Sequence, residues 1–343
     1  MDTLQEIVDN QVDNDRIYEQ AVDILNSGGI VAFPTETVYG LGAIATDEQA
    51  VQRIFEAKGR PSDNPLIVHI GNQSDIKKYA TDIPEIADIL MKAFWPGPLT
   101  LIMERKPGVI ADVVTAGLNT VAIRMPDHPI ALALLRKLDQ PLAAPSANRS
   151  GKPSPTEADH VYHDLIGRVP LILDGGETGV GLESTILDIT VTPPVILRPG
   201  GITKEQLEEL IGTVHMATLP TDQTVTPRAP GMKYAHYAPE APLFIIEPNA
   251  DSIAHALDTI HQQNQRVAII GPDELYTEHA DWYFFTGSIN SREAMASSLY
   301  KAIRQCDNTE ADIILAIETD HSGIGAAVMN RLDKASDGKR FTE

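Results

Sequence analysis

Two short apolar segments, STILDI at 184–189 and VILRPG at 195–200, are separated by only the five residues TVTPP. A crossover between parallel strands needs about a dozen residues or more, so these two strands are expected to run antiparallel. Elsewhere in the first two hundred residues, helical patterns such as DEQAVQRIFEAKG and HPIALALLRKL separate short apolar runs. The sequence therefore predicts an α/β fold on a mixed, twisted open sheet with helices, and not on a purely parallel sheet.

The organisation of the chain changes after a helix for which Thr203 is the expected N-cap. Residues 218–242 are rich in proline and show little periodicity, which indicates a linker or a lid. Beyond them, strand and helix patterns alternate again, as in a smaller Rossmann-like α/β domain. We expect a first domain over 14–205, a linker or lid over 206–241, and a second domain over 242–343.

The chain has 343 residues and a formal net charge of −21 at pH 7. This acidic excess disfavours strong RNA binding, because non-specific nucleic-acid binders usually present a basic face. The single cysteine, Cys306, excludes an internal disulfide and fits a reducing cytoplasm. The N-terminus lacks the apolar segment of a signal peptide, and no apolar run reaches the length of a bilayer span. We therefore expect a cytoplasmic protein that does not engage a membrane.

Several sequence motifs that would indicate a known cofactor, metal site or catalytic mechanism are weak or missing. GLGAIA at 40–45 matches the dinucleotide pattern, but PTETVY separates it from the preceding strand, so we interpret its glycines as permitting a tight turn. SGIGAAV, from Ser322, receives the same interpretation. The sequence contains no phosphate-binding GxxxxGK[ST] loop, no zinc-type spacing of Cys and His, and no GxSxG nucleophile elbow.

Polar residues nevertheless recur just past the ends of apolar strands, where α/β folds build their binding sites. Taken singly, each could serve solubility or helix capping, as Thr156 would before the next helix. The set consists of Lys58, Arg60, His69, Arg124, Ser146, Asn148, Ser154, Ser184 and Arg198. Its cations supply the charge that a triphosphate or a carboxylate needs. The residues alone thus predict a pocket for an anion of nucleotide size, without a protein nucleophile or a metal cage.

The stretch VAFPTETVYGLGA, from Val31, places two threonines, a carboxylate and a phenol in five positions after a strand. A turn needs only its proline and glycine. The additional polar groups at Thr35, Glu36, Thr37 and Tyr39 therefore indicate a surface that holds something small and polar.

These motifs together resemble the YrdC/Sua5 family of L-threonylcarbamoyladenylate synthases. The resemblance rests on FPTETVYGLG, AKGRPSDNPLIVHI, WPGPLT, TVAIRMPDHP, AAPSAN, ESTILDI and LRPGG, in that order, and on the linker APGMKYAHYAP. It implies a nucleotidyltransferase that makes threonylcarbamoyl-AMP and pyrophosphate from L-threonine, bicarbonate or CO2, and ATP. The product would feed the t6A modification of adenosine 37 in tRNA, through a separate transferase machinery.

The resemblance also implies roles for individual residues. Those around L-threonine would be Thr37, His69, Arg124, Ala144 and Ser184. Those that hold ATP would be Arg60, Asn64, Thr120, Ser146, Ser154, Arg198 and Tyr237. Lys58 and Arg60 would act on the phosphates, with Mg²⁺ carried by ATP and no metal bound by the protein itself. The hydroxyls of PTETVY would hydrogen-bond substrate, and Tyr237 would make the linker a lid, with a passive tether as the alternative.

Two other classes of function remain open from the sequence. An RNA-binding module would fit a pathway that ends in tRNA, although the net charge argues against it. A carbamoyl hydrolase or transferase would fit related domains of hydrogenase-maturation proteins, but the additional acylphosphatase and zinc-finger-like parts of those chains are absent from this sequence.

Overall fold

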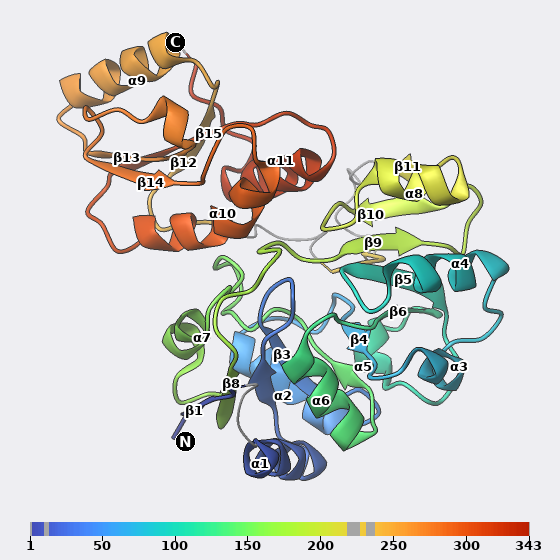
Figure 1. Ribbon diagram of the computed structural model, residues 1–343. Helices are drawn as coiled ribbons and strands as arrows, with labels where there is room; N and C mark the ends of the chain where they lie inside the picture. The colour runs from blue at the N-terminus through green and yellow to red at the C-terminus, as the bar shows by residue number, and fades with distance from the viewer. Residues whose placement is uncertain (1, 10–13, 218–226, 231–236, 343) are drawn as a thin grey trace. The chain divides into compact units, whose positions relative to one another are not determined.

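The computed structural model describes residues 2–9, 14–217, 227–230 and 237–342 (Figure 1). The chain divides into two compact units. Unit 1 comprises Met1–Ser150, Pro155–Gly179 and Glu183–Lys233, and unit 2 comprises Gly151–Ser154, Val180–Leu182 and Tyr234–Glu343. Much of the expected linker, 218–226 and 231–236, lies outside the described residues.

Unit 1 is built on a sheet in which the described strands follow the order β1-β8-β2-β3-β7-β4-β6-β5-β9-β10-β11. Its strands are β1 Leu4–Ile7, β2 Val31–Phe33, β3 Gly40–Ile44, β4 Ile67–His69, β5 Leu99–Glu104, β6 Thr120–Arg124, β7 Leu142–Ala143, β8 Leu171–Asp174, β9 Thr185–Asp188, β10 Val195–Arg198 and β11 His215–Met216. β5 pairs with β9 in parallel, whereas β9 and β10 are antiparallel, as the short TVTPP connection requires. The prediction of a mixed sheet is confirmed.

The helices of unit 1 begin and end mostly where the sequence signals place them. They are α1 Asp15–Asn26, α2 Glu48–Lys58, α3 Ile76–Tyr79, α4 Glu85–Phe94, α5 Asp112–Thr115, α6 Pro129–Leu138, α7 Ala158–Leu165 and α8 Lys204–Ile211, with a 3₁₀ turn at Gln73–Asp75. Thr203 caps α8 in a reciprocal capping box with Gln206, which confirms that prediction. Thr156 is not the cap of α7, because Glu157 occupies the N-cap position.

Both faces of the sheet carry apolar side chains, which alternate along each strand. One core joins Ala21 and Leu25 of α1 to Ile130 and Leu134 of α6, over Val31 and its neighbours in the sheet. The opposite face packs against α2, α4 and α7. The region where β4, β6, β5 and β9 lie side by side has a separate small apolar cluster, which contains Ala229 from the segment 227–230.

The glycines of GLGAIA do not form a turn. Gly40–Ile44 is the buried strand β3, antiparallel to β2, so the interpretation of a tight turn is wrong. Gly42 is required there by close packing, since a Cβ on this residue would lie 2.8 Å from Cε1 of Phe33. In SGIGAAV, by contrast, Gly323 adopts a left-handed φ of 55° just before the helix, as a turn glycine does.

Unit 2 contains a parallel sheet in the order β12-β15-β13-β14. Its strands are β12 Leu243–Ile246, β13 Val267–Gly271, β14 Trp282–Phe285 and β15 Ile313–Ile317, with a 3₁₀ turn at Asp273–Leu275. Helix α9 Ala250–Gln262 covers one face, and α10 Arg292–Cys306 and α11 Ile324–Ala335 cover the other (Figure 1). The expectation of a second, smaller α/β fold is confirmed. In the part of the chain that the structure describes, no helix is both long and apolar enough to cross a bilayer.

Candidate functional site

One face of the four strands β4, β6, β5 and β9 gathers many of the predicted residues. Ile67, Ala122, Ile102 and Asp188 are successive partners across these strands, and His69 pairs with Arg124. Directly paired residues, and every second residue along a strand, share a face of the sheet. The surface defined in this way, called the site face below, carries Ile67, His69, Thr100, Ile102, Glu104, Thr120, Ala122, Arg124, Ser184, Ile186 and Asp188.

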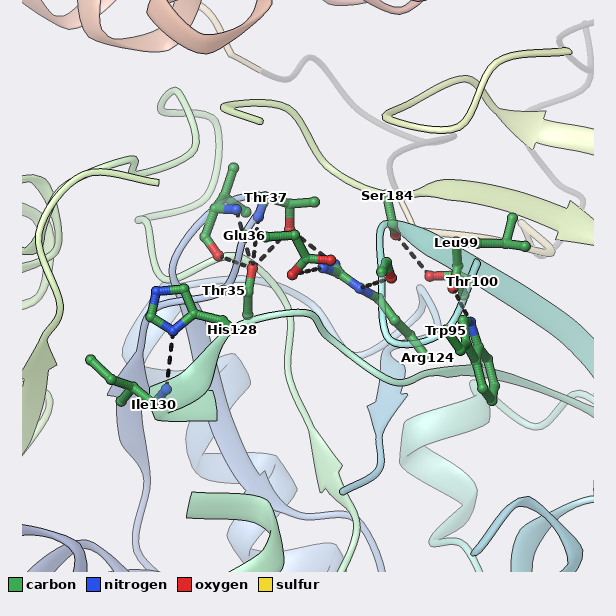
Figure 2. Close-up of polar contacts among 12 residues, drawn as sticks. Thr35, Glu36, Thr37, Trp95, Leu99, Thr100, Arg124, His128, Ile130 and Ser184 are labelled. Carbon is green, nitrogen blue, oxygen red and sulfur yellow. Dashed lines mark hydrogen bonds and ion pairs between the residues drawn. The ribbon is translucent and has the colours of Figure 1, made fainter. Parts of the chain in front are cut away.

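Arg124 ends β6 in the interior, with 3% of its surface exposed. Its Nε donates to the Gly97 carbonyl at 3.3 Å and its Nη1 to the Thr37 hydroxyl at 2.9 Å. Figure 2 shows the side chain extending toward Glu36 and Thr37. A cation buried in so apolar a strand needs an anionic partner, and Glu36 provides it, with Oε2 at 2.5 Å from Nη2.

The hydroxyls of Thr35 and Thr37 bond within the protein, which differs from the expectation that they face a substrate. The Thr35 hydroxyl donates to the Val38 carbonyl at 2.7 Å, so the 2.8 Å contact between the two hydroxyls has Thr37 as the donor. Thr37 Oγ1 in turn accepts from Arg124. A buried hydroxyl needs partners, and this chain of hydrogen bonds makes the turn a support that orients the guanidinium.

His69 occupies the position next to Arg124 on β4. Its imidazole Nδ1 lies 3.2 Å from the Ile67 carbonyl, and its ring meets Phe33 edge to face. Burial, and secondarily the charge of Arg124, lower the pKa of His69 to about 3. His69 is therefore a neutral hydrogen-bonding group beside the cation.

Ser184 and Arg198 meet at the start of β9. Arg198 donates to the Ser184 carbonyl from both Nε and Nη2, at 3.1 Å and 2.9 Å, and Nη2 also reaches the Ser184 hydroxyl. That hydroxyl lies 2.7 Å from Thr100 Oγ1 on β5. Two predicted residues are thus brought together, and Thr100 joins them although the sequence analysis did not name it.

Lys58 and Ser146 also converge, at the end of α2 and after β7. Lys58 Nζ donates to the carbonyls of Ser146 and Asn148, at 2.5 Å and 2.7 Å. Ser146 Oγ donates to Asn148 Oδ1, and Gly40 bridges to Ser146 from β3. Lys58 is 3% exposed, so this ammonium group is a buried cation held by carbonyls.

Arg60 and Asn64 lie in the loop between α2 and β4. In the orientation of the Asn64 amide that pairs donors with acceptors, Oδ1 accepts from Arg60 Nη2 at 2.9 Å and the amide nitrogen donates to the Ala229 carbonyl at 3.2 Å. Ala229 itself packs on Ile67 and Ala122. The loop that carries two predicted ATP residues therefore contacts the segment 227–230.

The remaining predicted residues are more widely spread. Thr120 begins β6 while Arg124 ends it, so the two are separated by about 13 Å along the same face. Ala144 follows β7 and donates its amide to the Ile67 carbonyl. Ser154 and Tyr237 belong to unit 2, where Tyr237 has a left-handed φ of 66° and its ring lies 5.1 Å from that of Tyr300.

Asp188 and Arg228 form a pair that the sequence analysis missed. Asp188 is fully buried on the site face, and its Oδ2 lies 2.6 Å from Arg228 Nη2. Its other oxygen accepts from the amide and hydroxyl of Thr190. A polar residue within an otherwise apolar strand was the feature of the sequence that could have identified them. Both Thr100 in LTLIME and Asp188 in STILDI show this feature.

Comparison with known protein families gives two matches that together cover most of the chain. The family model Sua5_yciO_yrdC, described as "Telomere recombination", matches residues 23–200, and the model described as "Threonylcarbamoyl-AMP synthase, C-terminal domain" matches residues 202–337.

Relatives extend over the full length. The chain is 51% identical to the Threonylcarbamoyl-AMP synthase of Bacillus subtilis over 97% of both chains, and 49% identical to that of Pyrococcus abyssi over 92% of this chain and 93% of the relative. The crystal structure of P. abyssi Sua5 complexed with L-threonine matches 99% of this chain and 98% of its own, with a TM-score of 0.91 and 45% identity. The chain therefore belongs to the Sua5/YrdC family, in the branch whose members carry the Threonylcarbamoyl-AMP synthase C-terminal domain.

Proposed function

We propose that the protein is a threonylcarbamoyl-AMP synthase, which converts L-threonine, bicarbonate or CO2, and ATP into threonylcarbamoyl-AMP and pyrophosphate. The relatives that share about half of its residues over the full chain carry this name. The observation in the structure that carries the proposal is Arg124, a buried guanidinium on the site face beside a neutral histidine. A carboxylate ligand suits such a cation because the two can form a bidentate, charge-assisted pair.

The threonine subsite is proposed around Arg124. The guanidinium would bind the substrate carboxylate, while Thr37, His69 and Ser184 would offer hydroxyl and imidazole groups to its polar atoms. Ala144, 5% exposed beside β4, would form part of the wall. These residues lie within or beside the site face of unit 1.

The nucleotide subsite is proposed around the cations of the same unit. Arg60, Asn64, Ser146 and Arg198 would hold ATP, with Lys58 as a further partner of the phosphates and Thr120 toward the far end of β6. Ser154 and Tyr237, which belong to unit 2, are the further residues proposed to bind ATP. Arginine forks match phosphate oxygens well and retain their charge when buried.

The reaction requires the protein to align the bound reactants and does not require a nucleophile from the protein. The neutral amine of threonine would form a C–N bond with the carbon of CO2 or bicarbonate to give a carbamate. The reaction with CO2 would release a proton, whereas the reaction with bicarbonate would release water and no proton. A carbamate oxygen would then attack the α-phosphorus of ATP, and the bond from that phosphorus to the pyrophosphate oxygen would break. Good alignment of bound reactants can lower the barrier by roughly 7–11 kcal/mol. Lys58, Arg60 and Arg198 would stabilise the charge that accumulates on pyrophosphate.

Mg²⁺ is proposed to enter on the phosphates of ATP, since this hard cation prefers such oxygen ligands. Bound there, it would neutralise charge on the leaving pyrophosphate. Within the described ranges, no group of three or more His, Cys, Asp or Glu side chains gathers as a metal site. The groups that this chain would contribute around the phosphates are the cations, hydroxyls and amide named above.

Pyrophosphate release tests the proposal directly. With Mg²⁺ present throughout, omission of threonine, bicarbonate or ATP in turn should abolish release, and mass spectrometry should detect threonylcarbamoyl-AMP only in the complete mixture. Release that is independent of threonine would overturn it. We further propose that the product is consumed in the cytoplasm by a separate transferase that modifies adenosine 37 of tRNA, and that tRNA itself binds this protein weakly.

A further inference from the structure

Glu36 forms a buried ion pair with the cation that is proposed to receive the substrate. Only 13% of its side chain and 4% of that of Arg124 are exposed, and the two meet at 2.5 Å. We infer that Glu36 binds the ammonium group of the amino-acid substrate, after serving as the resting counter-ion of Arg124 until the substrate carboxylate replaces it. This inference rests on the proposed function and assigns an individual role to a residue that the sequence indicated only as part of a polar surface.

The contact has the features of a pair that exchanges partners. Both carboxylate oxygens of Glu36 are buried, and neither accepts a hydrogen bond from any part of the chain that the structure describes. Arg124 Nη2 meets Glu36 Oε2 at 2.5 Å but donates no aligned hydrogen bond within those residues, so the contact is an ion pair without further hydrogen bonds. A purely structural buried pair is normally completed by further hydrogen bonds, because desolvation otherwise cancels the attraction. Here the hydrogen-bonding capacity of both groups remains available to a ligand.

The arrangement complements a zwitterion. An α-amino acid carries its ammonium and its carboxylate on the same carbon atom, so a cation and an anion that face each other at contact distance can receive both groups at once. The substrate carboxylate would turn to Nη2 of Arg124, and the Glu36 carboxylate would turn to the ammonium. Two charge-assisted contacts would then replace one. Thr37 and Gly97 keep the guanidinium oriented during the exchange, through Nη1 and Nε.

Among the titratable groups around the pair, Glu36 is the anion that can bind the ammonium group of the substrate. His128, at the N-terminus of α6, lies close enough for its charge to couple to Glu36, and burial lowers its pKa, so its ring is neutral at physiological pH (Figure 2). His69 is neutral on the other side of Arg124. An ammonium group that enters beside Arg124 would meet one cation and two neutral imidazoles, and would need the Glu36 carboxylate as its counter-ion.

A binding cycle with two ligands tests the inference. The ligands are L-threonine and 2,3-dihydroxybutanoate of matching stereochemistry, which replaces the ammonium by a hydroxyl and keeps the carboxylate. Titration calorimetry would measure both with the wild type and with Glu36→Gln. In the wild type, loss of the ammonium should weaken binding by about tenfold or more. In Glu36→Gln, threonine should bind at least about tenfold more weakly than to wild type, while the hydroxy acid should bind as well as before or better, because Arg124 is no longer occupied.

Asp127→Asn is the matched control, since it removes an exposed carboxylate three residues from Arg124 and should leave both affinities unchanged. Trp95 fluorescence would verify folding, and Glu36→Asp, which keeps the charge on a shorter side chain, should retain part of the preference for threonine. If loss of the ammonium weakened binding by the same factor in wild type and in Glu36→Gln, the inference would be overturned. Pyrophosphate release by the wild type would in that case still support the proposed function. Failure of the wild type to bind threonine at all would overturn both.

Discussion

His69 and Arg124 end the neighbouring parallel strands β4 and β6 and are direct partners in their register. Their side chains share the site face, in an interior where 4% and 3% of their surfaces are exposed. Two cations held side by side at such depth would repel each other strongly. The low pKa of His69, about 3, follows from this placement, first through burial and then through the guanidinium. His69 can therefore hydrogen-bond a ligand without competing with Arg124 for its anion.

This relationship predicts how the stability of unit 1 depends on pH. His69 titrates near 6.5 in an unfolded chain and near 3 in the folded protein. Between these values the unfolded state binds the additional proton, so the free energy of unfolding falls as the pH falls, by up to about 1.4 kcal/mol per pH unit. The wild type should lose stability more steeply than His69→Gln between about pH 6 and about pH 4.

Urea unfolding followed by Trp95 fluorescence would measure this slope. The chain has two tryptophans, and Trp282 lies in unit 2, so a Trp282→Phe background restricts the signal to unit 1. His163→Gln, on the exposed side of α7, is the control and should retain the wild-type slope. Equal slopes for the wild type and His69→Gln would show that His69 is not held neutral in the folded state.

The part of the site that the sequence predicts consists of polar residues that stand at the ends of apolar strands. His69, Arg124 and Ser184 stand at strand ends and reach one face because the side chains of a strand alternate. Arg198 and Lys58 follow the same logic at the ends of β10 and α2. Alternation alone, however, does not say which face of each strand is shared. That depends on the register between strands that are distant in sequence, so Thr100 and Asp188 were passed over.

Other features depend on packing that no local pattern contains. β3 was missed because Gly40 and Gly42 are poor strand formers, and only the close contact of Gly42 with Phe33 and Leu142 explains why a glycine stands at position 42. Glu36 was noted as a polar turn residue, but its partner Arg124 is 88 positions away in the chain, and a turn motif cannot predict that pairing. The contacts of Ala229 and Arg228 with the site face were hidden within a proline-rich segment that resembles a linker.

Gly42→Ala should destabilise unit 1. The added methyl group would lie 2.8 Å from Cε1 of Phe33 and 3.3 Å from Cδ1 of Leu142, in the middle of a fully buried strand. Overpacking of this kind costs about 1–3 kcal/mol, which the Trp95 unfolding curve would detect as a lower urea midpoint. Gly179→Ala is the control, since its nearest neighbour, the Glu36 carbonyl oxygen, is 4.0 Å away. An unchanged midpoint for Gly42→Ala would mean that β3 does not pack as tightly as described.

Arg60→Ala should abolish most pyrophosphate release while the protein remains folded. The guanidinium contacts the Asn64 loop and lies 6.0 Å from the centre of the Phe55 ring, so its loss removes little of the core. Loss of a group that stabilises developing phosphate charge slows the reaction by roughly 10²–10³-fold. Arg53→Ala, on the exposed side of the preceding helix α2, removes an equal charge and should keep release within about twofold of wild type. Similar rates for the two variants would exclude the phosphate role of Arg60.

The ion pair between Arg228 and Asp188 should anchor the segment 227–230 to the site face. Arg228 is partly exposed, but Asp188 is fully buried, so Arg228→Ala would leave a buried carboxylate with only its contacts to Thr190. We expect this variant to lower the stability of unit 1 by about 1–3 kcal/mol, in the Trp95 assay.

Asp188→Asn removes the charge of the side chain and keeps its shape. The variant that carries both Arg228→Ala and Asp188→Asn should therefore lose less free energy of unfolding than the two single variants lose in sum. A coupling free energy above about 1 kcal/mol would establish the anchor, whereas additive effects would show that the two side chains act independently.

Because Ala229 follows the anchor and packs on Ile67, Ile102, Ala122 and Ile186, a broken anchor should also uncover this apolar part of the site face. Backbone amides of 67–69 and 120–124 should then exchange hydrogen faster in Arg228→Ala than in wild type, and the amides of β12 to β15 should not.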